Sequence, residues 1–473
     1  MWRRSLPVVE PLDADQLDRV DATVTTLLQD VGLRITEPRL LKLLRDAGLA
    51  VEGDLVRFDR AFVDEQVARA PRTFQVYGRR RERDVTLGGD GIVLAPTGGQ
   101  PFITDPGGAR RYPTLDDYVV LTKITHAAEP LHMLGSGIVE CDDRPIESRH
   151  LDMDRAVIRW SDKPYFGVGA DTATTRDSIE LAAIAFGGRD AIERRPPLMM
   201  IVNPISPLQY DERMGGSLFE AASAGQPVVL MPYLLAGATA PLGIAGAVAQ
   251  AAAEALAGIA MVQLVRPETP AVFGTYVVEI DMRSGLPIFG TPGAGLAVMV
   301  AGQLARRAGV PFRAGGAFTD APVSSVRATQ DSLLSLLPSL FAGGNLLFHA
   351  AGWLEGSLST SVQKIAEDVE ALQRLERVVA APFDVSDEAF GFDAFVETGP
   401  GGIFLGADHT LRLLHAGVYT EPQPGAEASW EALLDRYEDP GLDPGVEAAL
   451  EDFVGRRTAE LASGQGLTAT TAR

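Results

Sequence analysis

Hydrophobic and polar positions follow two different patterns along the chain. In the first 88 residues, apolar positions recur at helical spacing over 13–31 and 37–47, and a short apolar run at 55–58 precedes another helical stretch from Asp59. From residue 91 onward, a short apolar run that ends in Gly, Pro or Asn is repeatedly followed by a longer helical pattern. The second pattern is typical of alternating β and α units.

The alternating region predicts eight strands and eight helices. The strands are expected at 92–95, 131–139, 165–169, 198–202, 228–231, 271–278, 311–314 and 345–349. The helices are expected at 114–126, 148–160, 174–186, 211–224, 241–265, 294–308, 326–341 and 361–379. Eight units predict an α/β fold, a closed (β/α)8 TIM barrel over 89–380. The alternative is an open doubly wound sheet in which two or three of the short runs are loops.

The two ends of the chain are predicted to add to this barrel. Residues 1–88 are expected to form a mostly helical N-terminal cap. Residues 381–473 are expected to form a C-terminal helical extension that packs on the barrel, with helices near 409–414 and 430–437. The last ten residues, 464–473, are expected to be a frayed tail.

The apolar stretch 240–265 is long enough to cross a bilayer, but Gln250, Glu254 and Gln263 lie in it at helical intervals. This spacing favours a buried helix with one polar stripe. The single cysteine, Cys141, cannot form an internal disulfide, and the first residues contain no apolar signal core, which predicts a cytoplasmic protein. The net charge of -21, without a long basic run, argues against a nucleic-acid partner.

Active sites of TIM barrels lie at the carboxyl ends of the strands, and aromatic and amide groups dominate those positions here. None of the four lysines falls at such an end, which argues against Schiff-base chemistry. The six histidines are scattered, so no tightly bound metal is predicted. An aromatic cup with few positive charges suits a quaternary ammonium group, which aromatic faces attract; ordinary barrel packing is the alternative for any one ring.

Several motifs in order resemble the trimethylamine methyltransferase family of corrinoid-dependent enzymes, in particular its members without pyrrolysine, such as glycine betaine methyltransferases. The resemblance covers nearly the whole chain. It rests on the sequences at 96–99, 203–208, 231–254, 281–285, 290–292, 319–321, 349–355 and 409–411. It implies a TIM barrel and transfer of a methyl group from a methylated amine to the cob(I)alamin of a separate corrinoid protein.

The resemblance also implies where the substrate binds. Asn203 and His349 match residues of the family's substrate pocket, and their polar groups are expected to hold a substrate carboxylate. Further expected pocket residues are, for the aromatic lining, Trp353, Phe348, Tyr276 and Phe102, and, for a glycine-rich turn, Thr97, Gly98 and Gly99. Glu355 and Asp320 are expected either to face the cation or to bond to neighbouring loops. No residue is expected to act as a general acid or base, because a neutral tertiary amine needs no proton when it leaves.

The chain departs from the family pattern at two places. Gly293 stands where many members have Glu, and Pro322 stands where many have Lys. The sequence contains only standard residues, so no pyrrolysine is available to hold trimethylamine, and a betaine-like quaternary amine is the expected substrate. The alternatives are a barrel that binds a methylated amine or osmolyte without turnover, and methyl transfer that involves another carrier such as a pterin. A homo-oligomer formed through outer helices is also compatible with the sequence.

Overall fold

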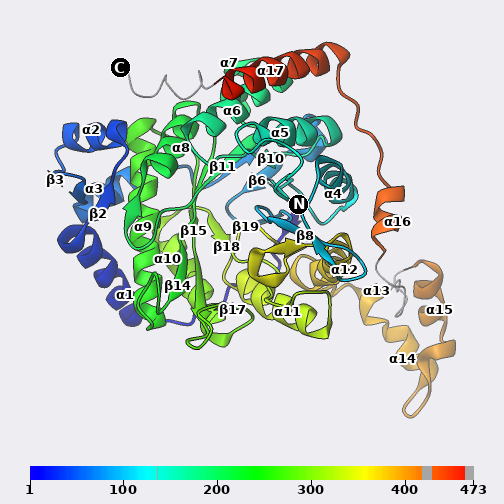
Figure 1. Ribbon diagram of the computed structural model, residues 1–473. Helices are drawn as coiled ribbons and strands as arrows, with labels where there is room; N and C mark the ends of the chain where they lie inside the picture. The colour runs from blue at the N-terminus through cyan, green and yellow to red at the C-terminus, as the bar shows by residue number, and fades with distance from the viewer. Residues whose placement is uncertain (136, 418–428, 464–473) are drawn as a thin grey trace.

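Seven parallel strands and one bridging segment form a closed barrel in the computed structural model, which describes residues 1–135, 137–417 and 429–463 (Figure 1). Neighbouring strands pair in the order β7-β19-β18-β15-β13-β11-β10, and β19 pairs with β7 through Leu346 and Val93. Their bounds are β7 Gly91–Leu94, β10 Tyr165–Phe166, β11 Leu198–Val202, β13 Val228–Leu230, β15 Ala271–Gly274, β18 Phe312–Ala314 and β19 Leu346–Leu347. The predicted TIM barrel is confirmed.

The second predicted strand, 131–139, is wrong as a continuous strand. Between β7 and β10, the chain forms a parallel bridge from Leu134 to Tyr165, and the N–H of His132 donates to the carbonyl of Leu94 over 2.8 Å. The segment 132–134 thus takes the place of an eighth strand and closes the barrel between β7 and β10. The predicted strand 271–278 is likewise divided, because β16 (Tyr276–Ile280) leaves the barrel and pairs with β14 (Tyr233–Ala236) and β17 (Pro287–Ile288).

The eight predicted barrel helices are present within three residues of their expected bounds. They are α4 Leu115–Ala127, α5 Arg149–Trp160, α6 Thr172–Phe186, α8 Glu212–Ser223, α9 Ile244–Val265, α10 Pro292–Ala308, α11 Val326–Phe341 and α12 Val362–Val379. Helix α9 is the one helix in the described ranges that is long and apolar enough to cross a membrane, and it is buried between the barrel and the N-terminal elements. Its burial fits the predicted core helix.

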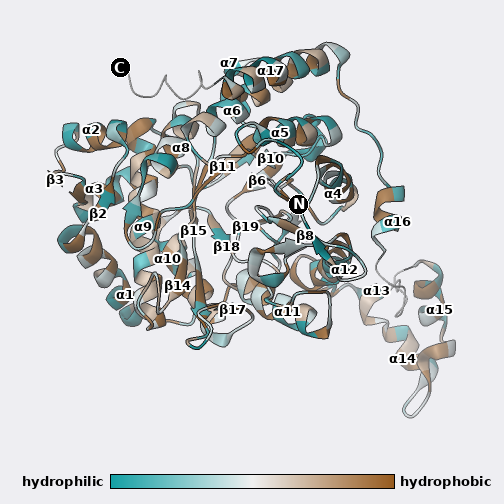
Figure 2. Ribbon diagram, viewed as in Figure 1, coloured by the Kyte–Doolittle hydropathy of each residue, from teal (hydrophilic) through white to brown (hydrophobic). Residues whose placement is uncertain are grey.

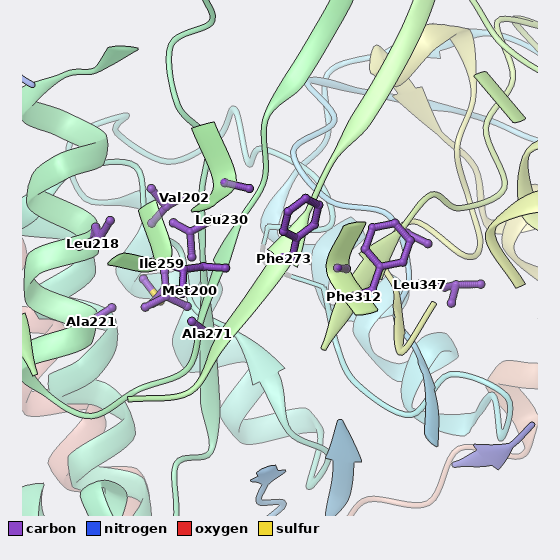
Figure 3. Close-up of a cluster of buried hydrophobic side chains, with 14 of the residues drawn as sticks. Met200, Val202, Leu218, Ala221, Leu230, Ile259, Ala271, Phe273, Phe312 and Leu347 are labelled. Carbon is purple, nitrogen blue, oxygen red and sulfur yellow. The ribbon is translucent and has the colours of Figure 1, made fainter. Parts of the chain in front are cut away.

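Two layers of apolar side chains fill the fold. Outside the strands, residues such as Met200 and Leu230 pack against α8 and α9 (Figure 3), and Phe312 lies on β18, which packs against α10. Inside the barrel, alternate residues of the same strands, such as Met199, Val229 and Val272, form a second cluster. The hairpin of β5 (Phe74–Val76) and β6 (Val85–Leu87) adds Val76, Val85 and Leu87 to this cluster. The barrel is therefore a packed core below the carboxyl ends of its strands.

The N-terminal region contains α1 Ala14–Thr26, α2 Pro38–Asp46 and α3 Arg60–Val67, together with the short strands β1 Trp2–Arg3, β2 Leu33–Ile35, β3 Ala50–Glu52 and β4 Leu55–Arg57. The first of these strands pairs with β7 of the barrel. Strand β2 pairs with β12 (Gln209–Tyr210), which directly follows a loop at the barrel mouth. The N-terminal region is thus joined by backbone pairing to both ends of the barrel.

The C-terminal region divides into two parts. Helices α16 (Trp430–Asp435) and α17 (Pro444–Ala462) pack on the barrel helices, α16 against α4 and α12, and α17 against α5 and α6. The other helices, α13 Asp387–Phe390, α14 Phe392–Thr398 and α15 Asp408–His415, project away from the barrel (Figure 1). Helix α17 was not predicted, and the predicted tail 464–473 lies outside the described residues.

Candidate active site at the carboxyl ends of the barrel strands

A pocket of about 550 Å³ opens at the carboxyl ends of the strands. Its position follows from the alternation of side chains along each strand. On β11, Met199 and Ile201 point into the barrel, and Asn203 continues this series at the pocket. On β13, Val229 points inward, and Met231 and Tyr233 continue the series in the same way. The pocket is therefore the uppermost, unfilled layer of the barrel interior.

Seven of the predicted site residues line this pocket. They are Gly98, Gly99, Asn203, Tyr276, Phe348, His349 and Trp353. Thr97 lies directly behind them, with its hydroxyl 3.4 Å from Nδ1 of His349. The turn at Gly99 has a φ of +84°, a conformation that side chains other than glycine rarely adopt, and its N–H donates to the carbonyl of Gly137.

The structure places the other three predicted residues outside the pocket lining. Phe102 lies on β8 (Phe102–Thr104), where its ring contacts Tyr112 and is covered by the guanidinium of Arg110. The carboxylate of Glu355 forms an ion pair of 2.7 Å with Arg110, and Asp320 forms an ion pair with Arg327. Of the two alternatives for these carboxylates, the structure shows bonds to neighbouring loops.

Aromatic rings form one wall of the pocket. Phe318 lies at the centre of this wall, with its ring centroid 4.2 Å from Tyr276 and 4.6 Å from Trp353. The imidazole of His349 lies between Phe348, at 3.9 Å, and Trp353, at 4.7 Å. Tyr276 and Trp353 were expected in this wall from the sequence, whereas Phe318 was not. Tyr276, Phe318 and Trp353 all line the pocket, and the faces of aromatic rings attract cations.

A buried guanidinium lies in the same pocket and was missed by sequence reasoning. Arg313 is in the middle of β18, between Phe312 and Ala314, which pack outward against the helices, so its side chain points into the barrel. Its side chain is 1% exposed, and its Nε and Nη1 atoms have no hydrogen-bond partner in the described parts of the chain. Burial lowers the pKa of Arg313 to about 9, so the group stays charged at neutral pH.

A lone buried cation of this kind is unfavourable unless a partner is supplied. The indole Nε1 of Trp353 is also buried without a partner in the described structure, and it lines the same pocket. Asn203 adds an amide at the exposed rim. These three side chains together offer hydrogen-bond donors to an anionic group. The sequence feature that could have identified Arg313 is an arginine between two core residues of a short strand.

His349 is held as a neutral imidazole. Burial, and secondly the charge of Arg313, keep the pKa of His349 well below its usual range. Its backbone is left-handed, with a φ of +67°, and its carbonyl accepts a hydrogen bond from the N–H of Ala317. Such a strained position needs support from its surroundings. Asp368 supplies part of it, because its carboxylate accepts from the N–H of Gly352 and pairs with Lys364.

The loop that carries Asn203 is fixed by Glu254 of helix α9. The Glu254 carboxylate accepts hydrogen bonds from the hydroxyl of Ser206, the N–H of Leu208 and the amide of Gln250. Glu254 is fully buried, and this desolvation raises its pKa. The polar stripe of the long apolar helix thus serves to hold one side of the pocket. Strand β12 follows Leu208 directly and pairs with β2.

The family departure at Gly293 has a structural counterpart. A Cβ atom at position 293 would lie 2.6 to 2.8 Å from the carboxylate of Glu279, which comes from β16. The carboxylate of Glu279 therefore occupies the space that a side chain at position 293 would need. Near the second departure, Pro322, the hydroxyl of Thr319 donates to the carboxylate of Asp331 over 2.8 Å. Arg327 forms ion pairs with both Asp320 and Asp331.

No group of three or more His, Cys, Asp or Glu side chains in the described ranges is placed to hold a metal ion. Cys141 is buried, and desolvation raises the pKa of its thiol to about 12. The described site therefore offers donors, aromatic faces and one fixed positive charge for binding a small molecule.

Comparison with known proteins identifies the family of the chain. The family model described as trimethylamine methyltransferase (MTTB) matches residues 1–423. The chain belongs to this family. It is 35% identical to a glycine betaine methyltransferase of Desulfitobacterium hafniense, over 96% of this chain and 98% of that protein. It is 26% identical to a proline betaine:corrinoid methyltransferase of Eubacterium limosum, over 84% and 85% of the two chains.

A solved structure supports the fold of this family member. The monomethylamine methyltransferase of Methanosarcina barkeri superposes with a TM-score of 0.54 over 94% of this chain and 88% of that one, at 10% sequence identity. This likeness concerns the barrel architecture alone. The family assignment confirms the resemblance drawn from the motifs at the strand ends.

Proposed function

We propose that this family member demethylates a betaine, a quaternary ammonium compound with a carboxylate, and transfers the methyl group to a corrinoid carried by a separate protein. The observation that carries the proposal is Arg313, a buried guanidinium without a protein partner inside an aromatic pocket. A quaternary amine without an anionic group would leave this charge unpaired. A substrate carboxylate would pair with it and also accept from Trp353.

The aromatic wall would bind the other end of the substrate. Tyr276, Phe318 and Trp353 offer faces to the methylated ammonium group, each contributing on the order of 0.5–2 kcal/mol when water is excluded. His349 is neutral, so it adds no positive charge beside the ammonium. The amine leaves as a neutral tertiary amine, which explains why the pocket needs no general acid. Its main tasks are positioning and exclusion of water.

A corrinoid supplies a strongly nucleophilic reduced cobalt that accepts a methyl group. The pocket is compatible with delivery of such a group by a partner, because exposed residues such as Asn203 and Arg213 form its rim at the surface. Ile146 and Met282 are exposed apolar side chains, each six residues beyond a pocket-lining residue, Glu140 or Tyr276, and a docked protein would cover them. We also propose a cytoplasmic location, which fits the buried reduced Cys141.

The proposal is tested by methyl transfer to cob(I)alamin under anaerobic, reducing conditions. Glycine betaine and choline are compared, because both carry a trimethylammonium group and only the first carries a carboxylate. We expect absorption of a methylated cobalamin with betaine and none with choline. Equal activity with choline would contradict the role of Arg313. Calorimetric binding of betaine without turnover, in the presence of a competent corrinoid protein, would instead indicate a binding protein.

A further inference from the structure

Residues 383–417, which we name the projecting arm, leave the barrel after α12 and extend away from it (Figure 1). The chain resumes on the body at α16, which packs against α12. Hydrogen bonds within the arm include that from the N–H of Asp408 to Glu397 and that between His409 Nε2 and the carbonyl of Glu388. The hydrogen bonds and ion pairs described for these residues join arm residues to one another.

The arm exposes more apolar surface than a free surface segment of this length can hold favourably in water. Eleven of its large apolar side chains are exposed, including Phe383 at 91%, Phe392 at 72% and Leu405 at 79%. Figure 2 shows hydrophobic residues along α13, α14 and α15. Covering its four most exposed phenylalanines would bury on the order of 500 Å². An apolar patch of this size marks a surface that another molecule covers.

A groove on the opposite side of the molecule fits the arm in chemistry. It has a volume of about 490 Å³ and lies between α1, α9 and α10, where it is lined by Leu12, Val20, Ile244, Val248, Leu296 and Val300. Arg19 also lines it, and its guanidinium has no ion-pair partner in the described ranges. The arm carries six acidic residues and one arginine. Apolar surface and opposite charge therefore match between the two.

The arm cannot reach the groove of its own chain, because the two lie on opposite sides of the barrel (Figure 1). We propose that the arm of one copy fills the groove of a second copy, and that two copies exchange arms in a two-fold dimer. Each chain supplies one arm and one groove, so the two-fold dimer leaves neither free to bind a third copy. Two arms with the grooves they cover would bury roughly 2,000 Å², within the range of stable interfaces.

The test measures the mass of the full-length protein in solution by light scattering after size exclusion. We expect wild type at twice the chain mass of 50.4 kDa. The arm variant F392E/L405E and the groove variant R19E/L296E are each expected at the single-chain mass, with unchanged circular dichroism. I146E, an equally exposed apolar residue outside both surfaces, is the matched control and is expected to stay dimeric.

Mixing the two variants distinguishes the proposed contact from other modes of pairing. The arm variant retains its groove, and the groove variant retains its arm. When the two are mixed at protein concentrations well above the Kd of the wild-type dimer, one arm–groove contact can form and mixed dimers are expected. A single-chain mass for wild type overturns the proposal. Dimers of the arm variant also overturn it. A groove variant that stays dimeric, or a mixture that stays at the single-chain mass, overturns the groove as the partner surface and indicates that arms pair with each other or bind elsewhere.

Discussion

The guanidinium of Arg313 lies above the ring of Phe348, with its central carbon 6.0 Å from the ring centroid. Phe348 is its only described cation–π partner, and no carboxylate in the described ranges pairs with it. A buried charge with so little compensation reduces the stability of the folded protein. The position is explained if the substrate carboxylate provides the missing partner.

Substitution of Arg313 by Met should separate stability from function. The variant removes an unpaired buried charge and keeps a similar volume, so we expect the free energy of unfolding to rise by about 1–3 kcal/mol. Betaine binding should fall by about 100-fold, since a charge-assisted hydrogen bond is lost. Denaturant unfolding and calorimetry measure the two effects. A variant that is less stable than wild type, with betaine affinity intact, would show that Arg313 has a structural partner instead.

The neutral state of His349 predicts a pH dependence of stability. The pKa of His349 is lowered in the folded state, so below the ordinary value of about 6.5 the unfolded chain takes up a proton that the folded chain does not. Stability therefore falls as the pH decreases through this value. One such histidine costs about 2 kcal/mol between pH 7.5 and pH 5.

The variant H349N tests this dependence, because asparagine tolerates the left-handed backbone at this position. Its free energy of unfolding should change less between pH 7.5 and pH 5 than that of wild type. Part of the slope should remain, because burial also keeps the pKa of His132 well below its usual range and lowers that of His126 to about 4. An identical slope in H349N and wild type would exclude this role.

Glu254 is expected to affect the pocket through the loop of Asn203. The variant E254A leaves the Ser206 hydroxyl and the Leu208 N–H without their acceptor, which should cost about 2 kcal/mol of stability or more and raise the Kd for betaine. Q263A, at the other end of the same helix, removes a buried hydrogen bond to Thr269 and is the matched control. It should lose stability without a change in Kd. Equal changes in Kd in both variants would mean that betaine binding depends on the stability of helix α9 and not on the bonds from Glu254 to the loop.

The proximity of Glu279 to position 293 predicts a compensating pair. G293E places a side chain and a second negative charge against the Glu279 carboxylate, which should destabilise the protein by about 1–3 kcal/mol. The double variant G293E/E279A should recover most of this loss, because one carboxylate then occupies the space. Additive effects in a double-mutant cycle would contradict this close approach.

Two aromatic residues should differ in their effect on the substrate. Phe318 is central to the aromatic wall, so F318A should raise the Kd for betaine by about 3- to 30-fold. Phe102, which lies outside the pocket lining against Tyr112, should leave the Kd unchanged when replaced by Ala. Calorimetry on both variants measures the difference, and a similar rise in both would show that the pocket extends to Phe102.

Much of the fold was predictable because hydrophobic periodicity is strong over long elements. Helices such as α11, Val326–Phe341, were placed at their observed bounds. Strands are harder to predict, since a barrel strand can be as short as two residues, and the described residues of the run 131–139 form isolated bridges in place of a continuous strand. The pocket residues at strand ends were largely identified, but Arg313 was not. One residue in the middle of a three-residue strand gives no periodic signal that shows which way it points.

The pairing of β2 with β12 connects the beginning of the chain to the pocket. Arg34 and Ile35 are made long before Gln209 and Tyr210, and the loop after Asn203 gains this strand neighbour only when the two segments meet. Replacement of Arg34 by Pro, which cannot donate the backbone hydrogen bond that Arg34 gives to the carbonyl of Leu208, would therefore loosen the side of the pocket that carries Asn203. The N-terminal region acts as a built-in clamp on substrate recognition, at a distance of more than 150 residues along the chain.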